Sequence, residues 1–373
     1  MNNTQLISMN DIMAIERPYD KRPIFKISWK MTDFCPYSCS YCYMANAVEK
    51  AKKCQNNPTQ FDVEEISSRI DELFERLGNK KDSIQLHLIG GEPSIFNLIK
   101  VIDKIKISNL KYLNLATNLY RNLDYYKELK MYCNSRGIEY GSSASFHITQ
   151  CNPKEYVEKV LALGVQTKIV VNNENLKLYK PYLEMFMDNN VSIELTVERN
   201  KKNECIRLDA DNLDFVQKVR EYQFERKARH KSFLPYYTVT LRNGQKIGYS
   251  SNIAMINSIK EGALDTSGFY CTAGLHNVRI EKNGNLKRSA CRLCSMYFKM
   301  GNILKGDYEK PSGEIICKCE EKGKDGILQE KYCTAFNNTS MHRIGYDRVN
   351  GVYNDKHGIK IPNYFEETYE KNN

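Results

Sequence analysis

Apolar and polar positions follow two different periods along the first two thirds of the chain. Short apolar runs rich in Val, Ile, Phe and Tyr predict β-strands, and apolar residues at helical spacing between them predict α-helices. The predicted strands lie within residues 24–32, 83–93, 111–118, 138–148, 165–172 and 192–198. Successive strand–helix units predict an α/β fold with a parallel sheet and right-handed crossovers. An open doubly wound sheet and a partial (β/α)6 barrel both fit this pattern.

The first of the predicted helices has recognisable ends. In the stretch FDVEEISSRIDELFERLG, Asp62 and Glu65 form a predicted capping pair, and Gly78 marks the end of the helix. One face of this helix is apolar and carries Ile66, Ile70, Leu73 and Leu77. Further helices are predicted near 95–107 and 123–136, after Asn152-Pro153, and over 211–231.

The composition of the chain changes after Pro235. Asn243-Gly244 and Asn283-Gly284 each predict the turn of a β-hairpin. Six of the 13 cysteines lie between 271 and 333. The sequence therefore predicts an N-terminal extension, a partial barrel, a smaller cysteine-rich domain and a tail, with boundaries at 1–23, 24–232, 233–340 and 341–373.

Composition and charge narrow the class of protein. No apolar run approaches the roughly 18 residues of a membrane span, and the N-terminus lacks the apolar core of a signal peptide. We therefore expect a cytoplasmic protein without a membrane partner, in which clustered cysteines bind metal in preference to forming disulfides. The net charge of +10 is compatible with anionic substrates or nucleic acid, although the lysines are scattered along the chain.

Three cysteines follow the first predicted strand in the stretch CPYSCSYC. Cys35, Cys39 and Cys42 have the spacing C-x3-C-x2-C. Structural zinc usually takes four protein ligands, whereas three thiolates on an iron–sulfur cluster leave one iron open to another ligand. The loop follows the carboxyl end of a strand, where ligands bind in α/β sheets and barrels. A structural zinc loop and three unrelated core cysteines are the alternatives.

A second motif, GGEP, follows the second predicted strand. Gly90 and Gly91 would let the backbone approach a ligand closely, and Glu92 could pair with an ammonium group. Pro93 restricts the backbone where the chain turns toward the next helix. An ordinary structural turn is the alternative interpretation of these four residues.

Together these motifs resemble those of the radical S-adenosylmethionine (SAM) enzymes. CPYSCSYC fits the family signature at each position, with Tyr41 as its aromatic residue. The resemblance implies a partial (β/α)6 TIM barrel and a [4Fe-4S] cluster, held by the three cysteines, whose open iron binds SAM. It also implies that the GGEP residues bind the SAM amino group. Asn118 and Ser143 resemble polar residues that approach the ribose or methionine of SAM.

The C-terminal cysteines resemble those of SPASM and twitch modules, which carry auxiliary [4Fe-4S] clusters. The resemblance is partial, because the full SPASM run C-x2-C-x5-C-x3-C is absent. It implies one auxiliary cluster, with Cys294 or Cys333 as a substitute ligand. The four ligands that we assign are Cys271, Cys291, Cys317 and Cys319. A zinc site with the same ligands is the chemical alternative.

Catalytic side chains are less well indicated. His147 could bind substrate or donate a proton. The alternative is that it is a histidine at the rim of the sheet whose hydrogen-bond partner is a backbone carbonyl. Glu198, next to Arg199, could bind a polar substrate, or the two could form an ordinary surface ion pair. Cys294 could donate a hydrogen atom if it is not a ligand.

The resemblance leaves the substrate open. A small metabolite, sugar or nucleotide suits the short N-terminal extension, with oxidation, epimerisation or rearrangement as the outcome and an oxidoreductase, epimerase or lyase as the class. Modification of a ribosomally made peptide or protein is the second hypothesis, and modification of nucleic acid is the third. An iron–sulfur electron-transfer protein is the non-enzyme alternative. An external reductant such as flavodoxin or ferredoxin is the expected partner.

Overall fold

The computed structural model describes residues 6–16, 24–42, 44–53, 57–198, 208–229, 237–249, 269–271, 273–288, 299–312, 315–316, 341–343, 346–347 and 352–353. Most of these residues build a nine-stranded sheet with the order β13-β12-β11-β2-β3-β4-β5-β6-β7. Its parallel central strands are β2 (Ile24–Thr32), β3 (Ser83–Gly90), β4 (Leu110–Thr117), β5 (Glu139–Ser145), β6 (Gln166–Val171) and β7 (Ile193–Val197). The six predicted strands are therefore confirmed, and their parallel arrangement is consistent with a partial barrel.

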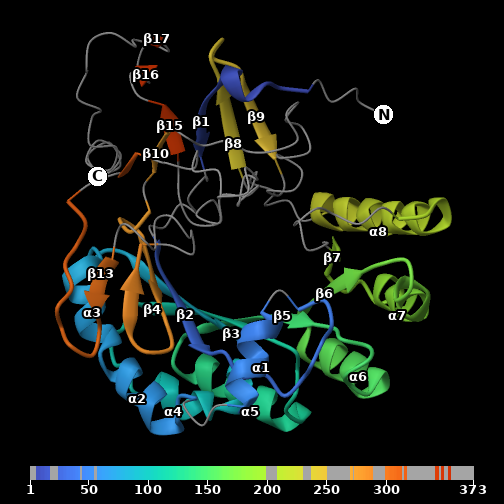
Figure 1. Ribbon diagram of the computed structural model, residues 1–373, viewed down its shortest axis with the longest axis horizontal. Helices are drawn as coiled ribbons and strands as arrows, with labels where there is room; N and C mark the ends of the chain where they lie inside the picture. Colours follow the sequence, from blue (N-terminus) through green and yellow to red (C-terminus); the bar gives the residue numbers. More distant parts are fainter. Residues whose placement is uncertain are drawn as a thin grey trace.

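Most of the helices lie on one face of this sheet. The helices are α1 (Ala45–Lys53), α2 (Gln60–Ser68), α3 (Ile70–Leu77), α4 (Leu98–Asp103), α5 (Leu123–Ser135), α6 (Pro153–Leu163), α7 (Leu176–Asp188) and α8 (Ala210–Arg229). In Figure 1, α2 to α7 lie along the outer side of the curved sheet. Buried apolar residues alternate along β2, β3 and β6 and pack on these helices, as the contact of Phe25 with Phe74 shows. The opposite, inner face is therefore left to the polar residues of the same strands.

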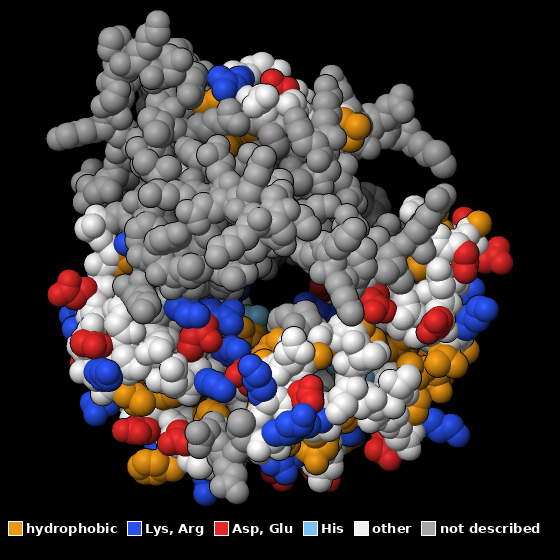
Figure 2. Space-filling model, viewed as in Figure 1, with side chains coloured by type: hydrophobic (Ala, Val, Ile, Leu, Met, Phe, Trp, Pro, Cys, Tyr) orange, Lys and Arg blue, Asp and Glu red, His pale blue; other side chains and the backbone are white. Residues whose placement is uncertain are grey.

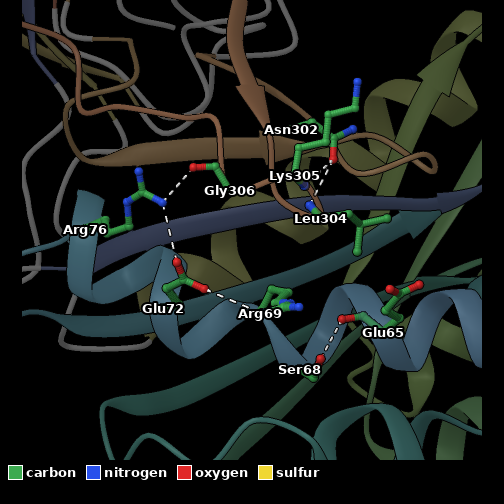
Figure 3. Close-up of polar contacts among 9 residues, drawn as sticks. All are labelled: Glu65, Ser68, Arg69, Glu72, Arg76, Asn302, Leu304, Lys305 and Gly306. Carbon is green, nitrogen blue, oxygen red and sulfur yellow. Dashed lines mark hydrogen bonds and ion pairs between the residues drawn. The ribbon is translucent and has the colours of Figure 1, made fainter.

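The stretch predicted as one helix is two helices in the structure. The capping box of α2 joins Thr59 and Asp62, so the predicted pairing of Asp62 with Glu65 is wrong. The hydroxyl of Ser68 donates to the carbonyl of Glu65 at 2.7 Å, as Figure 3 shows, and such back-bonding competes with the helical pattern. Arg69 is then the N-cap of α3, and Gly78 is its C-cap, as predicted for the end of the helix.

The second predicted hairpin extends the main sheet. It is formed by β11 (Asn277–Ile280) and β12 (Asn285–Lys287), followed by β13 (Lys299–Asn302). β11 pairs with β2 in parallel, so strands that the sequence assigned to a second domain lie at an edge of the first sheet. Arg76 of α3 holds the segment after β13, because its guanidinium donates to the carbonyl of Gly306 at 2.9 Å (Figure 3). It also donates to the carbonyl of Tyr308 at 2.7 Å.

A separate six-stranded sheet has the order β14-β10-β15-β1-β8-β9. Its strands are β1 (Ile12–Glu16), β8 (Tyr237–Leu241), β9 (Lys246–Tyr249), β10 (Phe269–Cys271), β14 (Ile315–Ile316) and β15 (Met341–Arg343). The hairpin at Asn243-Gly244 is confirmed as β8 and β9. β1 comes from the predicted N-terminal extension and pairs with both β8 and β15, so this extension is part of a sheet. The domain boundaries themselves stay predictions.

Within the described residues, no helix combines the length and apolar character that crossing a bilayer requires.

Candidate functional site

The cysteine loop lies at the carboxyl end of β2 and is held by contacts from two sides. Lys52 of α1 donates to the carbonyl of Tyr37 at 3.0 Å and to the hydroxyl of Ser38 at 2.6 Å. From the segment after β5, the side chain of Gln150 accepts the backbone N–H of Ser38 at 2.9 Å. The structure therefore fixes the backbone of the loop through residues other than its cysteines.

The thiols of Cys35, Cys39 and Cys42 are half-buried in this loop. Burial, together with nearby negative charge, raises the pKa of Cys35 to about 11 and that of Cys39 to about 12. Three thiolates in one another's field need a positive partner, and iron would supply one. Among the described residues, no three Cys, His, Asp or Glu side chains converge where a single ion could sit.

The two glycines of GGEP bring β3 against the cysteine loop. A Cβ atom on Gly91 would collide with the carbonyl oxygen of Phe34, and one on Gly90 would collide with that of Thr32. The backbone N–H of Gly91 donates to Thr32 at 2.8 Å, and that of Glu92 donates to Phe34 at 2.9 Å. The observed close approach is therefore between two segments of the chain, and an approach to a ligand stays a prediction.

Glu92 is completely buried and joins the ends of β3 and β4. Its carboxylate accepts hydrogen bonds from Ser94 N at 3.0 Å, Thr117 Oγ1 at 2.8 Å and Asn118 N at 2.6 Å. Burial raises the pKa of Glu92, and these hydrogen bonds oppose that rise. Both carboxylate oxygens have partners within the chain, and the predicted pairing of Glu92 with an ammonium group stays untested. Pro93 follows as the first residue of a short 3-10 helix (Pro93–Ile95).

Asn118 and Ser143 each leave a buried polar atom without a hydrogen-bond partner among the described residues. These atoms are Oδ1 of Asn118 and Oγ of Ser143, at the ends of β4 and β5. The amide nitrogen of Asn118 lies 3.5 Å from Sγ of Cys35, so this side chain is beside the cysteine loop. A buried polar atom without a partner costs free energy, and a polar ligand would remove that cost. The residues present therefore fit a polar small molecule next to the loop.

Tyr41 and His147 form a stacked, hydrogen-bonded pair. Their ring centroids are 5.8 Å apart, and the Tyr41 hydroxyl lies 2.9 Å from His147 Nδ1. Burial lowers the pKa of His147 to about 4, so its ring is neutral near pH 7. The alternative prediction was that a backbone carbonyl is the hydrogen-bond partner of the His147 ring. For Nδ1 this is wrong, because its partner is the hydroxyl of Tyr41. Tyr37, which sequence reasoning missed although it lies within the motif, packs edge-on against the same ring.

Glu198 lies just beyond β7 and is bound to its neighbour strand. Asn172 Nδ2 donates to Glu198 Oε2 at 2.6 Å, and the backbone N–H of Glu198 donates to Val171 at 2.8 Å. Arg199, its predicted alternative partner, lies outside the described residues. The structure therefore does not bring Glu198 into contact with the cysteine loop among the contacts described.

The auxiliary ligands are beyond what the structure describes. Cys271 ends β10, and its side chain is not described. The other cysteines predicted for this site lie outside the described residues, namely Cys291, Cys294, Cys317, Cys319 and Cys333. The auxiliary cluster and the hydrogen-donor role of Cys294 therefore stay predictions.

Sequence reasoning also missed the charged inner face of the sheet. Lys26, Ser28 and Lys30 alternate with the buried residues of β2. The alternation of polar and apolar residues in β2 was the available signal. A strand that is buried on both faces would be a continuous apolar run instead.

Comparison with known proteins identifies one region of the chain. No curated protein has significant sequence similarity to the chain. Residues 29–164 match the family model of the Radical SAM superfamily. This match runs from the second half of β2 to the end of α6 and includes the cysteine loop, GGEP, Asn118, Ser143 and His147. The chain therefore contains a Radical SAM superfamily domain at residues 29–164, which implies a [4Fe-4S] cluster and SAM as its cofactors.

Proposed function

We propose that the protein is a radical SAM enzyme that acts on a small metabolite, sugar or nucleotide. The observation that carries this proposal is that Asn118, whose buried Oδ1 has no partner among the described residues, lies 3.5 Å from Sγ of Cys35 in the cysteine loop. In such enzymes the [4Fe-4S] cluster reduces SAM to give a 5'-deoxyadenosyl radical, which abstracts hydrogen from the substrate. Cys35, Cys39 and Cys42 would hold the cluster.

The residues around the loop position the ligands. Glu92 holds the backbone of Asn118, and the Asn118 amide in turn reaches Cys35. The free Oδ1 of Asn118 and the hydroxyl of Ser143 would bind polar groups of SAM. Tyr41, which His147 orients, presents an aromatic surface beside the thiols. Gly90, Gly91 and Pro93 bring the end of β3 against the loop.

An auxiliary [4Fe-4S] cluster in the C-terminal part belongs to the same proposal. It rests on the resemblance of the cysteine pattern to twitch modules, with Cys271, Cys291, Cys317 and Cys319 as ligands and Cys294 or Cys333 as substitutes. Zinc at these ligands is the alternative. A flavodoxin or ferredoxin would supply electrons to the first cluster, and oxidation, epimerisation or rearrangement are the reaction classes that the proposal includes.

The experiment compares anaerobically purified protein with the triple variant in which Cys35, Cys39 and Cys42 are replaced by serine. Iron and zinc contents, Mössbauer spectra and reductant-dependent formation of 5'-deoxyadenosine from SAM are measured. We expect the triple variant to lose the iron of one [4Fe-4S] cluster and all of the SAM cleavage. Retained cleavage in this variant would overturn the site assignment. Iron without SAM cleavage in the wild type would favour an electron-transfer protein instead.

A further inference from the structure

A buried phenol lies beside the end of β4, on the helix-covered side of the sheet. It belongs to Tyr126 of α5, which is completely buried in the hydrophobic core. The Tyr126 hydroxyl donates to Ser94 Oγ at 3.0 Å and lies 3.2 Å from Thr117 Oγ1. The backbone N–H of Arg121 donates to the same hydroxyl at 3.4 Å. Tyr126 therefore joins the end of β4 to the segment that follows GGEP.

Thr117 connects this phenol to Glu92. Thr117 Oγ1 donates to Glu92 Oε1 at 2.8 Å, which uses the single proton of the threonine hydroxyl. The proton of Tyr126 is therefore the one available to both Ser94 and Thr117. A hydroxyl that accepts a hydrogen bond becomes a stronger donor, because bonds in a chain polarise one another. Tyr126 thus supports the hydrogen bond from Thr117 to Glu92.

The backbone next to Asn118 is held in an unusual conformation. Leu119 has a φ of +56°, which residues other than glycine rarely adopt. Its N–H donates to Thr117 Oγ1 at 3.0 Å, and Lys159 Nζ donates to its carbonyl at 3.1 Å. Strained backbone persists only where the surrounding structure holds it, and it clusters at ligand-binding sites. Thr117 therefore helps to fix the backbone from which the Asn118 side chain projects.

Glu92 carries this order to the cysteine loop. Its Oε2 accepts the backbone N–H of Asn118 at 2.6 Å. The Asn118 amide nitrogen lies 3.5 Å from Sγ of Cys35, and Asn118 Oδ1 is buried without a partner among the described residues. A continuous set of hydrogen bonds therefore runs from Tyr126 to the side chain that has an acceptor left for a ligand.

Tyr126 itself is out of reach of such a ligand. Figure 2 shows a hollow near the centre of the view, and Figure 1 shows α2 to α7 on the opposite side of the strands. Tyr126 is buried among those helices. Its effect on a ligand would therefore pass through Thr117, Glu92 and Asn118.

We propose that Tyr126 is a positioning residue for SAM, which acts through Thr117 and Glu92 to hold Asn118 in the orientation that binds SAM. This proposal rests on the proposed function for SAM as the ligand. Without the Tyr126 hydroxyl, Thr117 loses its supporting donor, and the Asn118 side chain gains freedom that SAM binding has to remove. Affinity for SAM falls, whereas iron binding, which depends on the three cysteines, is retained.

The test measures the dissociation constant of SAM by calorimetry on full-length, iron-loaded protein without reductant. Tyr126→Phe removes only the hydroxyl and should weaken SAM binding by about tenfold. Tyr125→Phe is the matched control on the same helix turn. The Tyr125 hydroxyl donates to the carbonyl of Phe96 at 2.7 Å, and it makes no described hydrogen bond to Ser94, Thr117 or Glu92. This control should bind SAM as wild type does.

Urea unfolding separates positioning from stability. Both Tyr→Phe variants lose the hydrogen bonds of one tyrosine hydroxyl, so both should unfold at lower urea concentration than wild type. Only Tyr126→Phe should also lose affinity for SAM. Circular dichroism and iron content show that each variant is folded and loaded before it is compared.

A second pair of variants tests the link through Thr117. Thr117→Val keeps the shape of the side chain without its hydroxyl and should weaken SAM binding. Thr117→Ser keeps the hydroxyl and should stay near wild type. Because Tyr126 and Thr117 act on the same path, the double variant Tyr126→Phe, Thr117→Val should bind more tightly than the product of the two single effects predicts.

The outcomes distinguish this proposal from the proposed function. Equal SAM affinity in wild type, Tyr126→Phe and Thr117→Val would overturn the role of Tyr126 and leave the proposed function standing. Equally weakened binding in Tyr125→Phe would also overturn it, because any loosening of α5 would then have the same effect. A wild type that binds iron but no SAM would remove the proposed function, and this inference with it.

Discussion

The side-chain amide nitrogen of Asn118 lies 3.5 Å from Sγ of Cys35. The backbone N–H of Asn118 donates to the buried carboxylate of Glu92 at 2.6 Å. One residue at the end of β4 therefore connects the cysteine loop to the acidic residue of GGEP. The two motifs that stand far apart in the sequence form a single hydrogen-bonded unit.

The first prediction concerns the amide of Asn118. Hydrogen bonds to the sulfur ligands favour the more negative, reduced state of an iron–sulfur cluster. Asn118→Ala should therefore lower the reduction potential of the cluster that Cys35 is proposed to bind. A redox titration followed by electron paramagnetic resonance measures this change. Asn134→Ala, an exposed change on α5, is the control and should leave the potential unaltered. An unchanged potential in Asn118→Ala would show that its amide does not reach the cluster ligand.

The second prediction separates two effects of replacing a glycine. A Cβ on Gly91 would strike the carbonyl oxygen of Phe34. A Cβ on Gly137 would meet nothing within 4 Å, but the new residue would have to keep the backbone φ of +67° that Gly137 has. Gly137→Ala should cost about 1 kcal/mol of unfolding free energy and leave iron binding intact. Gly91→Ala should displace the cysteine loop and lower the iron content. Denaturant unfolding and iron analysis check both variants, and full iron content in Gly91→Ala would contradict the prediction.

The third prediction concerns the guanidinium of Arg76. It donates to two carbonyls after β13, and its Cζ lies 4.2 Å from the centroid of the Tyr308 ring. Arg76→Ala should lower the free energy of unfolding by about 2–3 kcal/mol, because two charge-assisted hydrogen bonds are lost. Arg69→Ala removes only an exposed ion pair of 3.9 Å with Glu72 and should cost less than about 1 kcal/mol. Equal losses in urea unfolding would argue against the docking role of Arg76.

The central strands could be predicted from the sequence because burial imposes a local period on them. β2 alternates between buried and half-buried residues along its length, and its position in the sheet follows from chain order. The meeting of the cysteine loop with GGEP could also be expected, since both follow parallel strands. The helix α1 was missed, because its sequence ANAVEKAKK offers only Val48 and Ala51 to the core.

Long-range pairings could not be predicted in the same way. Nothing local to residues 277–280 indicates that β11 pairs with β2, or that β1 lies between β8 and β15. The partner of His147 is Tyr41, more than a hundred residues away, and periodicity carries no information on such a contact.

The last prediction is the pH dependence that His87 gives to stability. Its pKa is about 3 in the folded protein, against an ordinary value of 6.5. A histidine whose pKa is lowered by folding contributes stability above pH 6.5, and this stability is lost as the pH falls from 6.5 toward 3. The limiting slope is about 1.4 kcal/mol per pH unit, so wild type should lose roughly 2 kcal/mol between pH 6.5 and 5 through this residue.

His87→Gln should remove this contribution. Urea unfolding at pH 7 and pH 5 should therefore show a smaller loss of unfolding free energy in the variant than in wild type. Other titrating groups are common to both proteins and cancel in the difference. The same pH dependence in both proteins would mean that folding does not lower the pKa of His87.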